Sequence, residues 1–196
     1  LDADPFGQGF LEQISATQKK TRDFRLKTIE NVLKKVVPNL KQLKFTQDDV
    51  TGRPHLEMLY SHWRPNAGWQ REDQFSDGTL RMIAMLWTLL ASNSMILLEE
   101  PELSLNEKVV TQIPGLIFRT RQFRKKAGGQ IIVSTHSKAM LSENDIAGNF
   151  LVLEPGSQGE ATSIKPPSES DLSAMRSGLS PADVLLPQTA TAIQAI

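Results

Sequence analysis

The chain has 196 residues, 39% of them hydrophobic, which is enough to bury the core of one ordinary domain. Its 22 basic and 22 acidic residues balance, which excludes a strong overall field toward nucleic acid or membranes, and the lack of cysteine excludes disulfides and thiolate metal sites. Without a run of about 18 apolar residues or a visible signal peptide, the sequence predicts a soluble, cytoplasmic protein with no membrane partner.

Residues 10–37 predict one long helix. An apolar stripe at helical spacing begins at Phe10 and Ile14, includes Phe24 and continues through Leu33, and Pro38 ends the pattern. Lysines and arginines make the outer face basic. A solvated face explains this pattern better than a nucleic-acid surface does.

Residues 40–73 predict a small antiparallel meander, because short alternating runs are separated by turn sequences. Aromatic and basic side chains in this segment could stack on nucleic-acid bases, although half-buried hairpin aromatics are commoner. These side chains are Tyr60, His62, Trp63, Arg64, Trp69 and Arg71.

The stretch "QFSDGTLRMIAML" (74–86) places a serine, an acid and a glycine before an apolar helix. Ser76 is a good N-cap, and Asp77 is favourable near the positive end of the helix dipole. A helix start with a small, glycine-containing lead-in also presents amides to an anion, above all a phosphate. Both interpretations use the same amide groups.

Two short apolar runs, "SMILLEE" and "GGQIIVSTHS", predict buried strands of a parallel sheet covered on both faces. Residues 106–126 predict a helix between them, interrupted near Pro114 and Gly115. A short helix is expected over 138–146 and a hairpin around 155–159. The last predicted element is a helix capped by Ser180 with Pro181 at its first position.

Both predicted strands end in groups that can do chemistry. Glu99 and Glu100 end the first strand, and His136 follows the second, so all three are expected at the carboxyl edge of the sheet, where ligands bind. In phosphoryl transfer one acid serves the Mg²⁺ shell while another orients or deprotonates the attacking water. A neutral imidazole could hydrogen-bond the γ-phosphate or that water.

Four segments in this order and spacing resemble the motifs of an ABC-type ATPase head. The similarity is greatest to the RecF-like and OLD-like (overcoming lysogenization defect) group, related to the heads of chromosome-maintenance proteins. "FSDGT" resembles the signature motif, with Asp77 where glycine is commoner, and "MILLEEPE" resembles Walker B. "LSLNE" resembles the D-loop, ending in Asn106 rather than aspartate, and "STHS" resembles the switch-histidine loop.

The resemblance implies ATP and Mg²⁺ as cofactors and a role for each matching residue. Glu99 stands in the position of the magnesium-binding aspartate, and Glu100 in that of the catalytic base. His136 is implied as the second catalytic group. Residues at the signature and D-loop are implied to contact ATP held by another subunit: Ser76, Asp77, Gly78 and Asn106.

The implied fold class is α/β, P-loop NTPase-like, as the C-terminal lobe of such a head with a parallel sheet flanked by helices. We expect a single partial domain with a long helix (10–37), an antiparallel meander (40–73), a motif-bearing core (74–153) and a C-terminal hairpin and tail (154–196). No Gly-Lys dipeptide occurs, so the phosphate-binding Walker A loop is missing from these residues. We therefore expect a fragment or one half of a split head.

The leading functional hypothesis is an ATPase module in which ATP drives head dimerisation, coupled to DNA repair or phage defence. It requires Walker A from a homodimer or a split-head partner, and possible further partners are DNA and a separate nuclease or effector protein. The alternative is a non-hydrolysing interaction and dimerisation module. A metal phosphohydrolase using Glu99, Glu100, Glu102 and His136 is weaker, because adjacent acids and one histidine make a poor closed ligand set.

Overall fold

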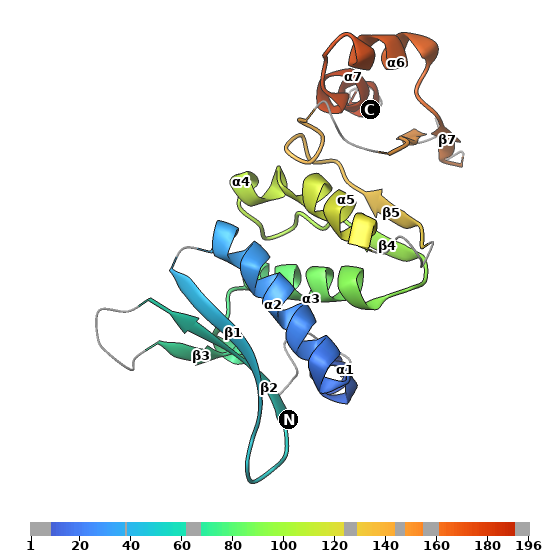
Figure 1. Cartoon of the computed structure of the whole chain (residues 1–196). Coiled ribbons are helices and arrows are strands. Elements are labelled where there is room, and N and C mark those ends of the chain that lie inside the picture. Colours follow the sequence, from blue (N-terminus) through green and yellow to red (C-terminus); the bar gives the residue numbers. More distant parts are fainter. Residues whose placement is uncertain are drawn as a thin grey trace. The chain divides into compact units, whose positions relative to one another are not determined.

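The computed structural model describes residues 9–37, 39–61, 68–123, 129–143, 148–154 and 161–190. The chain forms two compact units (Figure 1). The first comprises Leu1–Ile96 and Arg124–Ile131, and the second comprises Leu97–Phe123 and Ile132–Ile196. Within the described residues, every helix is too short or too polar to cross a membrane.

The first unit contains the predicted antiparallel meander. Strands β1 (Leu40–Gln47), β2 (Pro54–Tyr60) and β3 (Trp69–Arg71) lie in that order, with β2 in the centre. The register places Lys44 and Arg71 opposite Glu57. Cross-strand pairs of opposite charge favour this register, and Lys44 Nζ lies 2.9 Å from the Glu57 carboxylate.

The predicted single helix over 10–37 is wrong, because two helices occupy this range. Helix α1 (Phe10–Ala16) and helix α2 (Lys19–Val36) are separated by Thr17 and Gln18, whose ψ angles of 134° and 131° are extended. The break changes the phase of the buried stripe. Leu26, Ile29 and Leu33 are buried, whereas Phe24, expected in the stripe, is 67% exposed.

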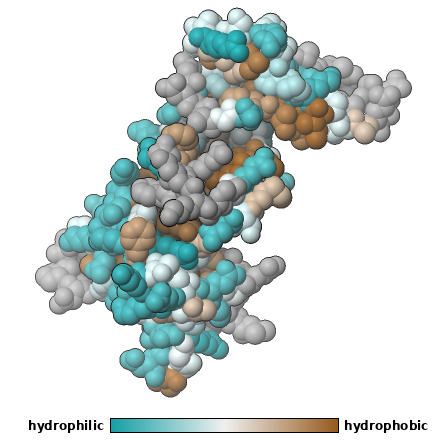
Figure 2. All heavy atoms as spheres, turned by 45° about the vertical axis from the view of Figure 1, so that its right-hand side comes forward, coloured by the Kyte–Doolittle hydropathy of each residue, from teal (hydrophilic) through white to brown (hydrophobic). Residues whose placement is uncertain are grey.

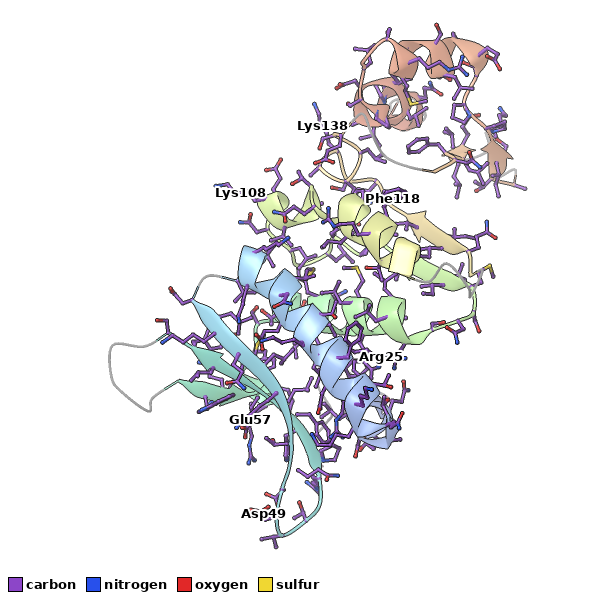
Figure 3. The ribbon with its side chains drawn as sticks, in the orientation of Figure 1. Arg25, Asp49, Glu57, Lys108, Phe118 and Lys138 are labelled. Carbon is purple, nitrogen blue, oxygen red and sulfur yellow. The ribbon has the colours of Figure 1, made fainter. Side chains whose placement is uncertain are left out.

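Helix α2 packs between the sheet and α3 (Asp77–Ala91), contacting β1 on one side and α3 on the other. Helix α3 is apolar around most of its circumference, a pattern typical of a buried helix. Burying each large apolar side chain contributes about 1.5–3 kcal/mol. The buried apolar residues of α3 are Met82, Ile83, Met85, Leu86, Trp87 and Leu89. Arg25 of α2, labelled in Figure 3, places its guanidinium 5.3 Å from the Trp87 ring centroid.

A buried acid joins α2 to the sheet. Glu30 is 1% exposed, and its carboxylate accepts hydrogen bonds from the Leu43 amide at 3.0 Å, from Lys27 at 2.7 Å and from Lys34 at 2.6 Å. Burial favours the neutral acid, but these three donors favour the carboxylate more strongly, and the pKa of Glu30 lies below its usual value. The charge on Glu30 therefore stabilises the fold at neutral pH.

The two predicted apolar strands are present, but the prediction that they are buried on both faces is wrong for the described residues, where only Ile96 is buried. Strands β4 (Ile96–Glu99) and β5 (Ile131–Ser134) pair with each other. The Ile96 amide donates to the Gln130 carbonyl and the Glu100 amide to the Ser134 carbonyl, each at 2.9 Å, and this constant offset defines a parallel pair. Leu97 and Ile132 are 67% and 44% exposed, so this face is uncovered in the part of the chain described.

Helices follow β4, whereas a loop and turns follow β5 in the described residues. The predicted helix over 106–126 consists of α4 (Glu107–Val110) and α5 (Ile113–Phe123), with the break beside Pro114 as expected; residues 124–126 lie outside the described ranges. The predicted helix over 138–146 is wrong for the described residues, because 138–141 form turns. The Leu141 carbonyl accepts from the Ala182 amide at 3.0 Å, which engages this segment with the start of α7.

The C-terminal part contains the predicted hairpin and the predicted last helix. Strands β6 (Val152–Glu154) and β7 (Ser163–Lys165) are antiparallel, and α7 (Pro181–Ala190) is capped by Ser180, whose Oγ accepts from the Asp183 amide at 3.2 Å. Helix α6 (Glu169–Arg176) was not predicted. Its signal is a capping box, in which Ser168 and Asp171 each accept from the other's backbone amide. Figure 2 shows a largely hydrophilic face with apolar groups gathered in separate patches.

We predict that Glu30→Gln destabilises the first unit by about 1–2 kcal/mol at pH 7, because it removes the charge that the two partly exposed lysines bind. The loss should shrink as the pH falls below about 4, since a depressed carboxyl pKa stabilises the fold only while the group stays ionised. Urea unfolding at pH 7 and at pH 3.5 measures this difference. Trp69 and Trp87 lie in the first unit, and the sequence ranges of the second unit contain no tryptophan, so fluorescence reports unfolding of the first unit.

The matched control is Glu12→Gln, because Glu12 is an exposed glutamate in a helix of the same unit. It should change stability little at either pH. An equal loss for Glu30→Gln at both pH values would contradict the electrostatic role of Glu30.

Candidate functional site

Ser76 caps helix α3, as the sequence predicts. Its backbone is extended, with φ −66° and ψ 151°, and its Oγ accepts from the Thr79 amide at 3.3 Å. Asp77 follows at the first helical position and pairs with Arg81 at 2.9 Å. Ser76 and Asp77 are both exposed. The start of α3 therefore presents a hydroxyl and the first-turn backbone at the surface of the first unit.

A second buried acid fixes the lead-in to this helix. Glu72 begins the short helix η1 (Glu72–Gln74), and the residue is 5% exposed. The carboxylate accepts from the Leu56 amide at 2.9 Å and lies 2.8 Å from Nδ1 of His55. Because both partners belong to β2, the meander holds the segment that leads to Ser76. Sequence reasoning missed Glu72, which carries no local motif.

The parallel pairing of β4 and β5 brings Glu100 and His136 together. The Glu100 amide makes the last ladder bond, to Ser134, and His136 follows two residues after that strand ends. His136 Nδ1 lies 2.7 Å from Glu100 Oε1, with side chains 76% and 35% exposed. The expected juxtaposition at the sheet edge is observed. The catalytic roles of the two residues remain predictions.

The turn after β4 has an unusual backbone. Glu100 has φ +41° and Ser104 has φ +64°, a region that residues with a side chain seldom occupy. The Leu103 amide donates to the Glu100 carbonyl and the Leu105 amide to the Glu102 carbonyl, each at 3.1 Å. Such conformations cost of order 1–3 kcal/mol each and cluster at functional sites. In this chain both strained residues belong to one compact turn, which also carries the side chains of Glu100 and Glu102.

Glu102 is the buried acid of this turn. It is 8% exposed, and its Oε1 accepts the hydroxyl hydrogen of Thr135, the residue before His136. Its Oε2 is buried and has no hydrogen-bond partner among the described atoms. Sequence reasoning considered Glu102 only as a metal ligand and did not single out Thr135. The sequence signal that could have identified Thr135 is its position directly before His136.

The loop after β5 continues toward α7. Lys138, labelled in Figure 3, has its Nζ 4.0 Å from Asp183 in the first turn of α7. Asn106 lies in the segment after β4, where its Oδ1 accepts a hydrogen bond from the Lys108 amide at 3.0 Å and caps α4. Asn106 is exposed, and its predicted contact with ATP remains a prediction. Glu99, the last residue of β4, is exposed as well.

The predicted site residues divide between the units. Ser76, Asp77 and Gly78 belong to the first, whereas Glu99, Glu100, Asn106 and His136 belong to the second. Within the second unit, the structure brings Glu100 and His136 together.

A magnesium ion fits the acidic and histidine side chains of the second unit only together with a nucleotide. No group of three or more acidic or histidine side chains able to hold a metal occurs within the described ranges. Mg²⁺ is commonly bound by one or two carboxylates, several waters and substrate phosphates. An exposed single carboxylate such as Glu99 suits that arrangement, and the phosphohydrolase reading with a protein-only metal centre is not supported.

The candidate nucleic-acid side chains make contacts within the unit. Lys44 Nζ lies 3.8 Å from the Trp69 ring centroid, and Arg71 lies 3.6 Å from Glu57. His62, Trp63 and Arg64 lie outside the described residues. On α2, basic side chains pair with acids of the same helix, as in the 2.7 Å bond from Lys19 to Asp23. These pairs agree with the prediction of a solvated face.

Comparison with known families identifies the class of protein. Residues 10–142 match the family described as "AAA domain, putative AbiEii toxin, Type IV TA system". This match spans more than half of the chain, so the chain belongs to that family, and it is an AAA-type ATPase domain. The comparison with curated proteins found no match.

Solved structures show the same fold at low sequence identity. One comes from work on ATP-driven dimerization and DNA-stimulated activation of SMC ATPases, with TM-score 0.55, 13% identity, and coverage of 86% of this chain and 93% of that one. A second is the Smc head domain with a coiled coil and joint from Pyrococcus yayanosii, with TM-score 0.57, 14% identity and coverage of 81% and 29%. The fold is therefore P-loop NTPase-like.

A third similar structure is the SmcHead bound to the C-winged helix domain of ScpA, with TM-score 0.57 and 13% identity. The alignment covers 84% of this chain and 50% of that one. This chain thus spans nearly all of the first of these structures and half or less of the other two.

Proposed function

We propose that this chain is the C-terminal half of an ABC-type ATPase head of the RecF-like and OLD-like group, and that ATP bound between two heads drives their association. The observation that carries the proposal is the Glu100–His136 pair at the carboxyl edge of parallel strands. Support comes from membership of an AAA family and from the fold shared with SMC heads, one of which was studied for ATP-driven dimerization.

Glu100 serves as the base that takes a proton from the attacking water. The contact with His136 Nδ1 determines what the imidazole can offer. When Nδ1 carries its hydrogen toward Glu100, a neutral ring has Nε2 only as an acceptor, which suits the attacking water. A protonated ring has both nitrogens as donors and suits a γ-phosphate oxygen. The pair therefore positions either the water or the phosphate according to the charge on His136.

Ser76 and the start of α3 cap the γ-phosphate bound by the other head. The exposed hydroxyl and first-turn backbone suit an anion, as at other helix starts. Glu99 holds Mg²⁺, which neutralises phosphate charge when the nucleotide is bound. Walker A, which these 196 residues lack, is supplied by other residues of the full-length protein or by a split-head partner.

The cellular task follows from the resemblance alone. We propose that ATP-driven association serves DNA repair or phage defence in the cytoplasm, with DNA and a separate nuclease or effector as partners. One of the similar heads was solved bound to a separate protein, ScpA.

We expect Glu100→Gln in the full-length protein to lower ATP turnover by about 10²-fold or more, because the amide keeps the shape but cannot accept the proton. ATP binding and association should persist. His136→Ala should lower turnover in the same direction. Phosphate release and nucleotide binding, measured on the same preparations, separate the two steps.

Glu107→Gln is the control, because Glu107 is an exposed glutamate in the same unit, at the first position of α4. It should leave turnover unchanged. Equal losses of ATP binding and turnover in Glu100→Gln would instead indicate that Glu100 is structural.

Ser76→Arg should leave the protein folded and abolish ATP-driven association. The helix loses one cap, about 1 kcal/mol, while the long side chain occupies the place of the partner's γ-phosphate. Size-exclusion chromatography with and without ATP measures association. Mixing this variant with a copy whose Walker A lysine is replaced, but whose Ser76 is intact, should restore one composite site and part of the turnover.

Ser168→Arg is the matched control, because it also removes a serine N-cap, that of α6, which is not part of the signature segment. It should lower the melting temperature similarly and leave association intact. If Ser76→Arg and Ser168→Arg associate equally well with ATP, capping across the interface is wrong.

A further inference from the structure

We infer that Glu102, acting through Thr135, is a positioning residue that sets the place of His136 beside Glu100. The catalytic meaning of this inference rests on the proposed function, whereas the positioning itself is a property of the fold. The two glutamates of one turn hold two consecutive residues of the loop after β5. Glu100 contacts His136, and Glu102 accepts from Thr135.

The contact between Glu100 and His136 is too exposed to fix the imidazole by itself. The His136 side chain is 76% exposed, and ion pairs or hydrogen bonds in such surroundings contribute little because water competes with both partners. The bond from Thr135 to Glu102 differs, because the carboxylate is buried and has lost its water. A hydrogen bond to a desolvated charged group is stronger and more directional.

The Thr135 hydroxyl also binds the backbone of Ser137, the residue after His136. Its Oγ1 donates to Glu102 and accepts from the Ser137 amide at 3.0 Å, so one hydroxyl restrains the backbone on both sides of the histidine. The Ser137 Oγ accepts in turn from the amide of Met140, which is 4% exposed, at 3.4 Å. The loop is thereby joined to the Walker B turn at one end and to the core at the other.

A purely structural role accounts poorly for a carboxylate at this position. One oxygen of Glu102 is buried with no partner among the described atoms, and burying a charged oxygen in this way is costly. An apolar pair at positions 102 and 135 would fill the space without that cost, but it would lack the direction that a hydrogen bond provides. A loop that carries a catalytic imidazole requires the fixed orientation that a directional hydrogen bond provides.

Thr135→Val tests the inference, because it keeps the shape of the side chain and removes the hydroxyl. NMR of the chain provides two readouts that are independent of ATP. The exchange of the Ser137 amide should become about threefold to tenfold faster, the factor expected for losing one hydrogen bond of ordinary strength. The neutral imidazole of His136, followed by its ¹⁵N shifts, should move from the Nδ1–H toward the Nε2–H tautomer. With three histidines in the sequence, the signals can be assigned.

Two further variants make the result interpretable. Thr135→Ser retains the hydroxyl and should restore both readouts. Thr120→Val is the control, because Thr120 is a threonine of the same unit that donates its hydroxyl to the Leu116 carbonyl at 2.8 Å. It should destabilise the unit comparably and leave Ser137 and His136 unchanged. If Thr135→Val does not fold, Thr135→Ala replaces it.

The inference is overturned if Thr135→Val leaves both readouts unchanged, or if Thr120→Val changes them equally. ATP turnover of the full-length protein separates this failure from failure of the proposed function. If both hold, Thr135→Val lowers kcat at an unchanged KM for ATP, and Thr135→Ser restores it. If Glu100→Gln leaves turnover intact, the proposed function fails, and the NMR result still decides the positioning.

Discussion

The parallel pairing of β4 with β5 is the constraint on which the candidate site depends. Parallel strands end at the same edge of a sheet, so the side chains that follow them meet there although a helix-bearing segment separates them in sequence. The Glu100 amide closes the last ladder bond with Ser134, and this bond places Glu100 and His136 within 2.7 Å. A shift in the register of this pair would separate the two groups.

Within each unit, buried glutamates join neighbouring elements. Glu30 binds the backbone of β1 from α2, Glu72 binds the backbone of β2 from η1, and Glu102 binds Thr135 from the turn after β4. In each case a carboxylate on a helix or turn accepts a hydrogen bond from a strand or from the loop that follows a strand. An acid makes a specific connection of this kind because an unmatched buried charge is costly, which disfavours any alternative packing. The first two connections stabilise the unit with Ser76, and the third stabilises the unit with His136.

Local signals in the sequence predict much of the fold and part of the site. The N-cap at Ser76, the two apolar strands, the meander and the capped last helix all depend on short-range patterns, and all are observed. The adjacency of Glu100 and His136 was also predictable, because it follows from strand order alone. The capping box at Ser168 was equally visible and would have identified α6.

The remaining features depend on tertiary contacts that leave weak traces in the sequence. The break at Thr17 and Gln18 shifts the buried stripe, so Phe24 is exposed although its spacing fits the helix pattern. Glu30 lies on the same helical face as Leu26 and Leu33, but a single acid in an apolar stripe does not reveal its partners. Thr135 and Glu102 are 33 residues apart, and only the folded sheet shows that they bind each other.

A structure of the full-length protein with a non-hydrolysable ATP analogue and Mg²⁺ tests the central claim most directly. We expect the γ-phosphate beside His136, with the attacking water within hydrogen-bond distance of Glu100 and with Ser76 of a second copy on the same phosphate. A nucleotide bound away from the ends of β4 and β5, or a γ-phosphate that touches neither side chain, would contradict the account.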